Sequence, residues 1–212
     1  MSMILKRKSV LSLFSALIIL VSVFSFNMNT KAVTGTEALP DLSNFENVDL
    51  SATFNLTEGG MQEEMIYDED GEYVGAIEIE IVDMVDVAGN PIEIPHGGTF
   101  RVPEGATTYK VSVYAGVGPD LWLEYEVTVW NFINGAPLYI IDAGNESAHV
   151  DDPYFGQIEE ESLKIMNPIE DGSNVAWTRY NLQLTSGMDI WLDTRAYYGN
   201  ITTSMCFTDL CP

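Results

Sequence analysis

An alternation of apolar and polar side chains marks the segment Leu121–Ile133 as a structural centre of this chain. The odd positions from Leu121 to Val129 are all apolar or aromatic, whereas the even positions carry two tryptophans, two glutamates and a threonine. Because successive side chains of a strand point to opposite faces, this pattern predicts a long β-strand with one buried and one solvent-facing side. The solvent-facing side is unusual in carrying Trp122 and Trp130.

The same two-residue period recurs along the chain and predicts about ten short strands. Asp68–Gly71 separates two such segments, 61–67 and 72–82, and an Asp-Gly turn favours a tight hairpin because it tolerates positive φ. Turn signals at intervals of roughly 8–12 residues are typical of all-β folds. We therefore predict an antiparallel two-sheet β-sandwich, with a partly closed β-barrel as the alternative. The remaining predicted strands are 50–56, 99–102, 108–115, 138–142, 162–166, 174–185, 188–198 and 201–207. The longest irregular stretch, 144–157, is a candidate functional loop.

The N-terminal segment has the three-part layout of a signal peptide. Lys6, Arg7 and Lys8 precede the apolar run Val10–Phe26, and small residues at positions 30 and 32 offer a cleavage site. This layout predicts a signal peptide over residues 1–32. An uncleaved membrane anchor is the alternative, because the run approaches the roughly 17–25 residues that span a bilayer. A flexible lead-in is predicted over 33–48 and a single β-domain over 49–212, in a secreted, extracellular protein that could also associate with the cell surface.

Charge narrows the choice of partners. The chain has 9 basic and 32 acidic residues, and four of the basic ones precede the proposed cleavage point, which leaves 5 basic residues and a net charge of −27. Such a charge repels nucleic acid and anionic membrane surfaces, so neither is expected as a partner. This net charge is compatible with a role in solubility alone, with binding of a divalent cation, or with a cationic partner. A hydrophobic content of 46% with 11% aromatics suffices for a folded core.

Three stretches resemble a family of small exported proteins found mainly in Gram-positive bacteria (Firmicutes) and catalogued as a domain of unknown function. These stretches are FNLTEGGMQEEMIYDEDGE at 54–72, TYKVSV at 108–113 and LWLEYEVTV at 121–129. Ser162–Lys164 and Thr194–Ala196 fall where that family has a Ser-Leu segment and an Arg-Ala pair. The resemblance covers most of 50–200 and implies a secreted β-domain, but it implies no chemistry. This chain differs in its strong acidity and in its C-terminal cysteine pair.

One strand carries carboxylates in a pattern that suggests catalysis. Glu78, Glu80 and Asp83 resemble the E-x-D-x-x-E strand of jelly-roll β-glucanases, in which two carboxylates act as nucleophile and general acid. The order of Glu and Asp is altered here, and Asp83 needs a β-bulge to share the face of the two glutamates. The alternative is the solvent face of an ordinary antiparallel strand. The acidic turn at Asp68 fails as an EF-hand, because the positions that require Gly and Glu are Tyr73 and Ile79.

Acidic residues in and beside the irregular stretch form the candidate metal site. No cofactor is expected from the sequence; a Ca²⁺ ion is the alternative, because hard oxygen ligands suit it. The candidate ligands are Asp142, Glu146, Asp151 and Asp152. With His96 and His149 as the only histidines, a transition-metal site lacks imidazole ligands. Cys206 and Cys211 are predicted to form a short local disulfide in an oxidising compartment.

Aromatic side chains on polar strand faces are the candidate binding residues. Trp122 and Trp130 share one such face, and Trp191 and Tyr197 share another. If the two strands face the same way, the four side chains form one platform on which sugar rings or a protein partner could pack. The alternative is that a second sheet or a loop covers these faces.

These patterns together favour a non-enzymatic, secreted or cell-surface module that binds an extracellular glycan or protein partner. A wall-associated glycoside hydrolase that uses Glu78 and Glu80 is the first alternative. A structural exoprotein without a small ligand is the second.

Overall fold

A computed structural model describes residues 50–68, 70–95, 98–131, 138–151, 153, 155–171 and 174–207. The predicted signal peptide and lead-in lie outside the described residues. Within them the regular structure is β-strand throughout, and no helix long and apolar enough to cross a membrane is found.

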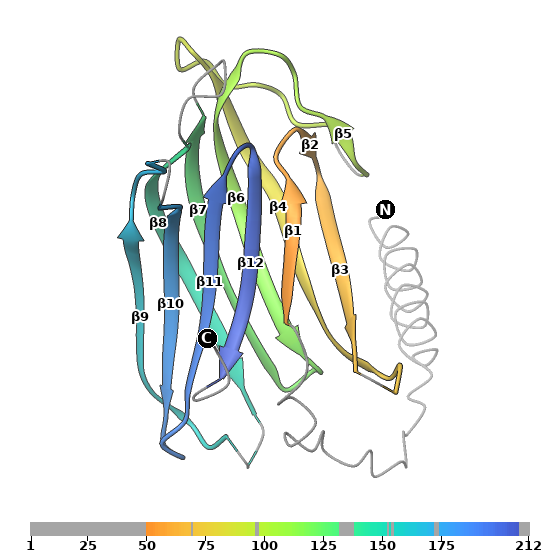
Figure 1. The fold of residues 1–212 in the computed structure, drawn as a ribbon, viewed down its shortest axis with the longest axis vertical. Coiled ribbons are helices and arrows are strands. Elements are labelled where there is room, and N and C mark those ends of the chain that lie inside the picture. The colour runs from red at the N-terminus through yellow and green to blue at the C-terminus, as the bar shows by residue number, and fades with distance from the viewer. Residues whose placement is uncertain are drawn as a thin grey trace, which may run out of the picture. The chain divides into compact units, whose positions relative to one another are not determined.

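The described strands form two five-stranded antiparallel sheets and a small two-stranded one (Figure 1). The C-terminal sheet has the order β1-β12-β11-β10-β9, the central sheet has the order β3-β4-β6-β7-β8, and β2 pairs with β5. None of the three closes into a barrel, so the predicted two-sheet sandwich is confirmed. The strands are β1 Ser51–Asn55, β2 Glu58–Gly59, β3 Met61–Tyr67, β4 Tyr73–Asp86, β5 Phe100–Arg101, β6 Ala106–Val117, β7 Leu121–Asn131, β8 Leu138–Val150, β9 Ile158–Asn167, β10 Ala176–Leu184, β11 Asp189–Tyr197 and β12 Asn200–Phe207.

The core lies between the two large sheets, and one face of β7 lines it. Leu123, Tyr125, Val127 and Val129 are completely buried, while the residues between them are partly exposed. This confirms the alternation that predicted the strand. Isoleucines of β4 and valines of β6 extend the buried face of the central sheet, and alternate residues of β10 and β11 oppose them from the C-terminal sheet.

A buried hydroxyl group connects the two sheets at the centre of the core. Tyr125 of β7 donates a hydrogen bond of 2.5 Å to the Thr194 hydroxyl of β11, and its oxygen lies 2.9 Å from the Thr178 hydroxyl of β10. Burial raises the pKa of this phenol well above its ordinary value. Because buried polar groups need partners, this contact specifies how the sheets align as well as holding them together.

The structure corrects the prediction of an irregular stretch over 144–157, because β8 continues to Val150. The pairing of β8 with β7 shifts register twice, between Glu124 and Glu126 and between Thr128 and Val129. These bulges break the two-residue period on which the prediction depended. In the first bulge Asn145 adopts a positive φ of 56°, and its side-chain amide donates a 2.5 Å hydrogen bond to Glu126. The first half of the segment, residues 144–150, is therefore a bulged strand.

Candidate functional site

The outward face of β4 presents the three acidic residues that the sequence singled out. Its pairing with β6 places Glu78 opposite Tyr114, Glu80 opposite Ser112 and Asp83 opposite Lys110. A register shift between Ile81 and Asp83 supplies the bulge that Asp83 needed to join this face. The strand thus carries all three carboxylates on the solvent side of the central sheet.

Neighbouring strands add further carboxylates around Glu78. Glu63 of β3 lies directly opposite Glu78, and Glu124 of β7 lies opposite Tyr114 on the other side. Burial, followed by the negative charges of Glu63 and Glu124, raises the pKa of Glu78 above its ordinary value. The Ser112 hydroxyl donates a 3.1 Å hydrogen bond to Glu124. A shallow pocket of about 140 Å³ opens between Glu78, Glu124 and Tyr114.

An aromatic row borders this acidic pocket on the same face. The Trp122 ring lies between Tyr114, at 6.2 Å and 30°, and His149, at 5.9 Å and 23°, measured between ring centroids and planes. Tyr114 can lie flat across the sheet because residue 116 is glycine. A Cβ atom there would come within 2.4 Å of the Tyr114 hydroxyl oxygen. We call Tyr114, Trp122 and His149 the aromatic row.

Trp130 belongs to a separate part of the same face. It packs on Tyr139 with ring centroids 5.6 Å apart and borders a pocket of about 380 Å³ at the Asp86–Gly89 turn. Eight residues of strand separate it from Trp122, which corresponds to roughly 26 Å. Trp122 and Trp130 therefore share a sheet face but cannot contact one small ligand together.

The predicted single platform of four aromatics is not formed. Trp122 and Trp130 lie on the outer face of the central sheet, whereas Trp191 and Tyr197 lie on the outer face of the C-terminal sheet. The two faces point away from each other, because the buried sides of the sheets meet in the core. The condition that both strands face the same way therefore fails.

The candidate calcium ligands are spread along a strand. Asp142 and Glu146 lie within β8, and Asp151 follows its last residue, roughly 30 Å from Asp142 in an extended strand. Asp152 lies outside the described residues. In the part of the chain that is described, no three Asp, Glu, His or Cys side chains are grouped so that they could hold a metal ion. Cys206 is disulfide-bonded, and its predicted partner Cys211 lies outside the described residues.

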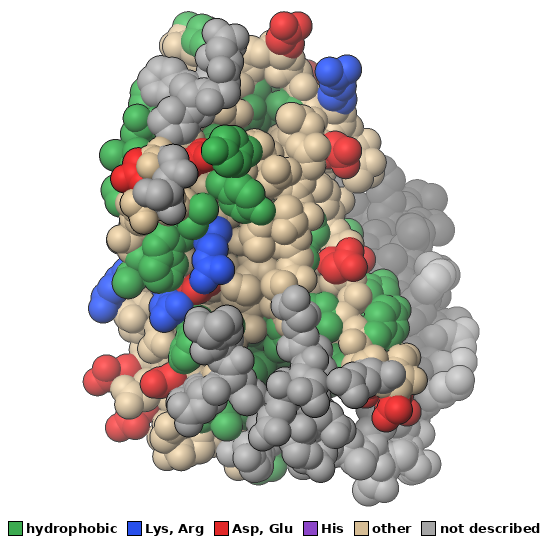
Figure 2. All heavy atoms as spheres, in the orientation of Figure 1, with side chains coloured by type: hydrophobic (Ala, Val, Ile, Leu, Met, Phe, Trp, Pro, Cys, Tyr) green, Lys and Arg blue, Asp and Glu red, His purple; other side chains and the backbone are tan. Residues whose placement is uncertain are grey.

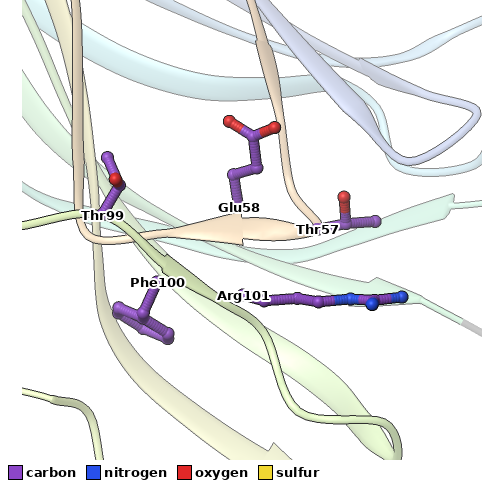
Figure 3. Close-up of a pocket in the computed structure, with 5 residues that line it drawn as sticks. All are labelled: Thr57, Glu58, Thr99, Phe100 and Arg101. Carbon is purple, nitrogen blue, oxygen red and sulfur yellow. The ribbon is translucent and has the colours of Figure 1, made fainter.

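The small β2–β5 sheet borders the largest of these hollows, about 560 Å³ and widely open (Figure 3). Thr57, Glu58, Thr99, Phe100 and Arg101 line it. The Phe100 ring occupies the space that a Cβ atom on Gly59 would need, so the two strands approach closely. Glu58 and Arg101 point in different directions in this view (Figure 3). The hollow thus lacks the converging polar groups of a ligand site.

Sequence reasoning missed several residues that the structure brings together. Tyr114 and His149 join Trp122 only through cross-strand pairing, and Glu124 joins Glu78 in the same way. On the opposite face, Trp177, Arg179 and Asp193 gather beside Trp191. The alternation of apolar and polar residues shows which positions of a strand face outward. It does not show which strand lies beside it.

Comparisons with known proteins add little to this picture. No family model matches the chain, and no curated protein matches it. Among solved structures, the chain is similar to a hypothetical protein from Listeria monocytogenes at 18% sequence identity, covering 72% of this chain and 100% of that one with a TM-score of 0.36. These findings are consistent with a domain of unknown function. A likeness this distant carries no functional argument, so the assignment rests on the surfaces.

Proposed function

We propose that this protein is a non-enzymatic binding module that acts outside the cell and binds a glycan on the outer face of the central sheet. The observation that carries the proposal is the aromatic row beside the carboxylates Glu78 and Glu124. Aromatic rings offer the flat apolar surface on which the CH groups of a sugar ring pack. Carboxylates and the Ser112 hydroxyl can accept and donate the hydrogen bonds that sugar hydroxyls need.

Charge narrows the class of glycan. Glu63, Glu78 and Glu124 lie in one row across the four strands β3, β4, β6 and β7, so their charges would repel an acidic sugar at this site. A neutral or amino sugar avoids that cost, and an amino group would gain from the carboxylates. Secretion through the predicted signal peptide, and an origin like that of the Gram-positive exported proteins it resembles, would place the module at a cell wall rich in such sugars.

The test is retention of the purified protein on insoluble polysaccharides and isolated bacterial cell walls. Replacing Trp122 with alanine is expected to weaken retention by roughly fivefold or more, because one stacking contact contributes on the order of 1 kcal/mol beyond the area it buries. Trp130→Ala is the matched control, since it removes the same side chain from the same face at a distance. Thermal unfolding verifies that both variants fold. If the Trp122→Ala variant is retained as strongly as the wild-type protein, the proposal is refuted. If the protein is retained by protein partners and by none of the polysaccharides, the ligand is a protein.

A glycoside hydrolase is the second candidate, favoured by the β4 bulge that aligns Glu78, Glu80 and Asp83. Against it stands the shape of the face, because its pocket of about 140 Å³ is too small to enclose a sugar and exclude water. The two candidates separate cleanly in a reducing-sugar assay on the retained polysaccharide. Hydrolysis that a Glu78→Gln, Glu80→Gln double variant abolishes would establish the enzyme. Retention without hydrolysis supports the binding module.

A further inference from the structure

The outer face of the C-terminal sheet holds an arginine clamped between two tryptophans. The Arg179 guanidinium carbon of β10 lies 5.2 Å from the Trp177 ring centroid and 4.8 Å from that of Trp191 on β11. Its Nε and Nη2 atoms donate hydrogen bonds of 2.7 Å and 2.8 Å to the two carboxylate oxygens of Asp193. Stacking on both sides and a bidentate bond in its plane fix the orientation of the guanidinium.

This clamp leaves hydrogen-bond donors to spare. A guanidinium has five N–H donors in a rigid fork, and the Asp193 carboxylate accepts from its Nε and Nη2 atoms only. The Asp193 side chain is 1% exposed while that of Arg179 is 33% exposed, so the fork has an open side that faces solvent. A donor group that is already immobilised binds an oxyanion without the entropy cost of ordering a free arginine.

The distribution of positive charge points to the same place. The described residues include five basic side chains, and three of them, Lys164, Arg179 and Arg195, lie on this face. Lys164 is the cross-strand partner of Arg179, and Arg195 reaches to 3.5 Å from Asp193 with its side chain 46% exposed. With Asp193 as the counter-charge the cluster keeps two positive charges in a protein that is otherwise strongly acidic. Figure 2 shows these blue side chains gathered over β9–β11 with green aromatic and apolar groups beside them.

Uncharged hydrogen-bonding groups continue the face beyond the cluster. On β12 and β1, Ser204 pairs with Ser51 and Thr202 pairs with Thr53, whose hydroxyl oxygens lie 2.8 Å apart. Ser204 and Thr202 in turn are the cross-strand partners of Asp193 and Arg195. This part of the face is the tan area beside the blue side chains in Figure 2. A row of hydroxyls on a flat sheet suits a ligand that carries many hydroxyls of its own.

From this arrangement we propose that the outer face of the C-terminal sheet is a second binding site, for a polysaccharide that bears carboxylate groups. The carboxylate is held by the open side of Arg179 together with Arg195 and Lys164, and the sugar rings extend over the hydroxyls of β12 and β1. A planar carboxylate matches the guanidinium fork in a bidentate geometry. The hydroxyl rows favour a sugar chain over an acidic peptide, which has few groups to pair with them.

The site is independent of the glycan site proposed on the central sheet. The two lie on opposite faces of the sandwich, and the basic cluster around Arg179 favours carboxylate groups, which the glutamates of the central sheet repel. A protein with both would link a neutral or basic glycan to an acidic one. Loss of binding at either face leaves the other measurable.

A titration of the purified protein with an oligogalacturonate, followed by tryptophan fluorescence and calorimetry, tests the proposal. The fully methyl-esterified oligomer is the ligand control, because it keeps the sugar chain and removes the charge. Saturable binding of the acid form alone is expected. Equal binding of the ester, or of dextran sulfate or polyglutamate at the same charge concentration, would overturn the assignment to a carboxylate-bearing sugar.

Variants locate the site on this face. The double variant Lys164→Gln, Arg195→Gln removes two exposed positive charges and keeps the bidentate Arg179–Asp193 pair, and it is expected to weaken binding by roughly 10- to 100-fold, as for the loss of charge-assisted hydrogen bonds. Arg101→Gln, Lys110→Gln is the matched control, because it changes the net charge equally away from this face. If the two double variants weaken binding equally, the effect is one of overall charge and the proposed site is wrong.

Discussion

The buried hydroxyl of Tyr125 offers the sharpest test of how the two sheets are held together. Replacing it with phenylalanine keeps the ring, which packs edge-to-face on Tyr180 at 6.1 Å, and removes only the oxygen. The Thr178 and Thr194 hydroxyls that contact it are both completely buried. After the change the nearest hydroxyls left to them are those of their cross-strand partners, which are each other across β10 and β11 and Thr203 of β12 beside Thr194.

The expected cost follows from that geometry. Leaving a buried hydrogen-bonding group short of a partner costs about 1–3 kcal/mol, and a new bond between the two threonines offsets part of it. We therefore expect Tyr125→Phe to lower the free energy of unfolding by about 1–2 kcal/mol. The triple variant with Thr178→Val and Thr194→Val removes all three hydroxyls of this contact between the sheets. It is expected to lie within about 1 kcal/mol of the wild type, because apolar groups of similar shape leave nothing unsatisfied.

Urea denaturation of the wild type, the single variants and the triple variant measures these differences as shifts of midpoint at constant slope. In a thermal scan each 1 kcal/mol corresponds to about 2–4 °C in a domain of this size. A single variant that costs less than about 0.5 kcal/mol would mean that the hydroxyl is not desolvated as described. A triple variant whose cost equals the sum of the three single costs would show that the hydroxyls act independently, and it would refute the coupled network.

Three further changes test other parts of the structure. Glu78→Gln should stabilise the fold by about 0.2–1 kcal/mol at neutral pH, because it removes a negative charge opposite Glu63. Since the pKa of Glu78 is raised above its ordinary value near 4.5, the charged form is the unfavourable one. The stabilisation should therefore vanish in thermal scans at a pH below that value and appear as the pH rises through the raised pKa, and an effect that does not change over this range would contradict the charge repulsion. Gly75→Ala should cost roughly 1–3 kcal/mol in urea unfolding, because its Cβ would lie 2.2 Å from the carbonyl oxygen of Gly116 and would force β4 and β6 apart. Gly144→Ala, which meets nothing within 4 Å, serves as the tolerated comparison, and equal costs for the two would contradict the close approach. Arg179→Leu leaves the buried Asp193 carboxylate with only the longer contact to Arg195, so we expect a loss of about 2–4 kcal/mol, against about 0–1 kcal/mol for Arg195→Leu. If Arg179→Leu lowers the free energy of unfolding no more than Arg195→Leu does, the buried Asp193 carboxylate does not depend on its bidentate partner.

The two outer faces of the sandwich carry different charged side chains. For the two proposed sites, the charge of each face is more informative than the net charge of the chain. Lys110 on the outer face of the central sheet is neutralised locally, because it pairs with Glu126. The hydrogen bond from Lys110 lowers the pKa of Glu126, so this carboxylate stays charged in acid where Glu78 takes up a proton. On the outer face of the C-terminal sheet, Lys164, Arg179 and Arg195 surround the single carboxylate of Asp193. Glu160 and Asp189 lie farther along the same strands, where both pair with Gln183. The net charge of the whole chain does not show this difference between the two sheet faces.

The sequence by itself determined the strand alternation and much of the turn chemistry. From Leu121 to Trp130 the buried and partly exposed positions of β7 follow its two-residue period, because a pleated strand between a core and solvent imposes that period. The hairpin at Asp68–Gly71 also follows from local chemistry, since the Asp68 carboxylate accepts hydrogen bonds from the backbone N–H groups of Asp70 and Glu72. Local interactions of this kind involve residues a few positions apart, so the sequence alone suffices to predict them.

Only the tertiary structure decided which outward-facing residues meet. Trp122 and Trp191 read alike in the sequence, yet strand pairing puts them on opposite sides of the molecule. The alternation tells inside from outside along one strand, but it carries no information on which strand lies beside it or in which sheet. The bulges of β8 likewise come from its pairing with β7 and erase the local period. The clamped Arg179 and the aromatic row exist because strands that are distant in sequence pair in one register, and that register is set by packing of the whole core.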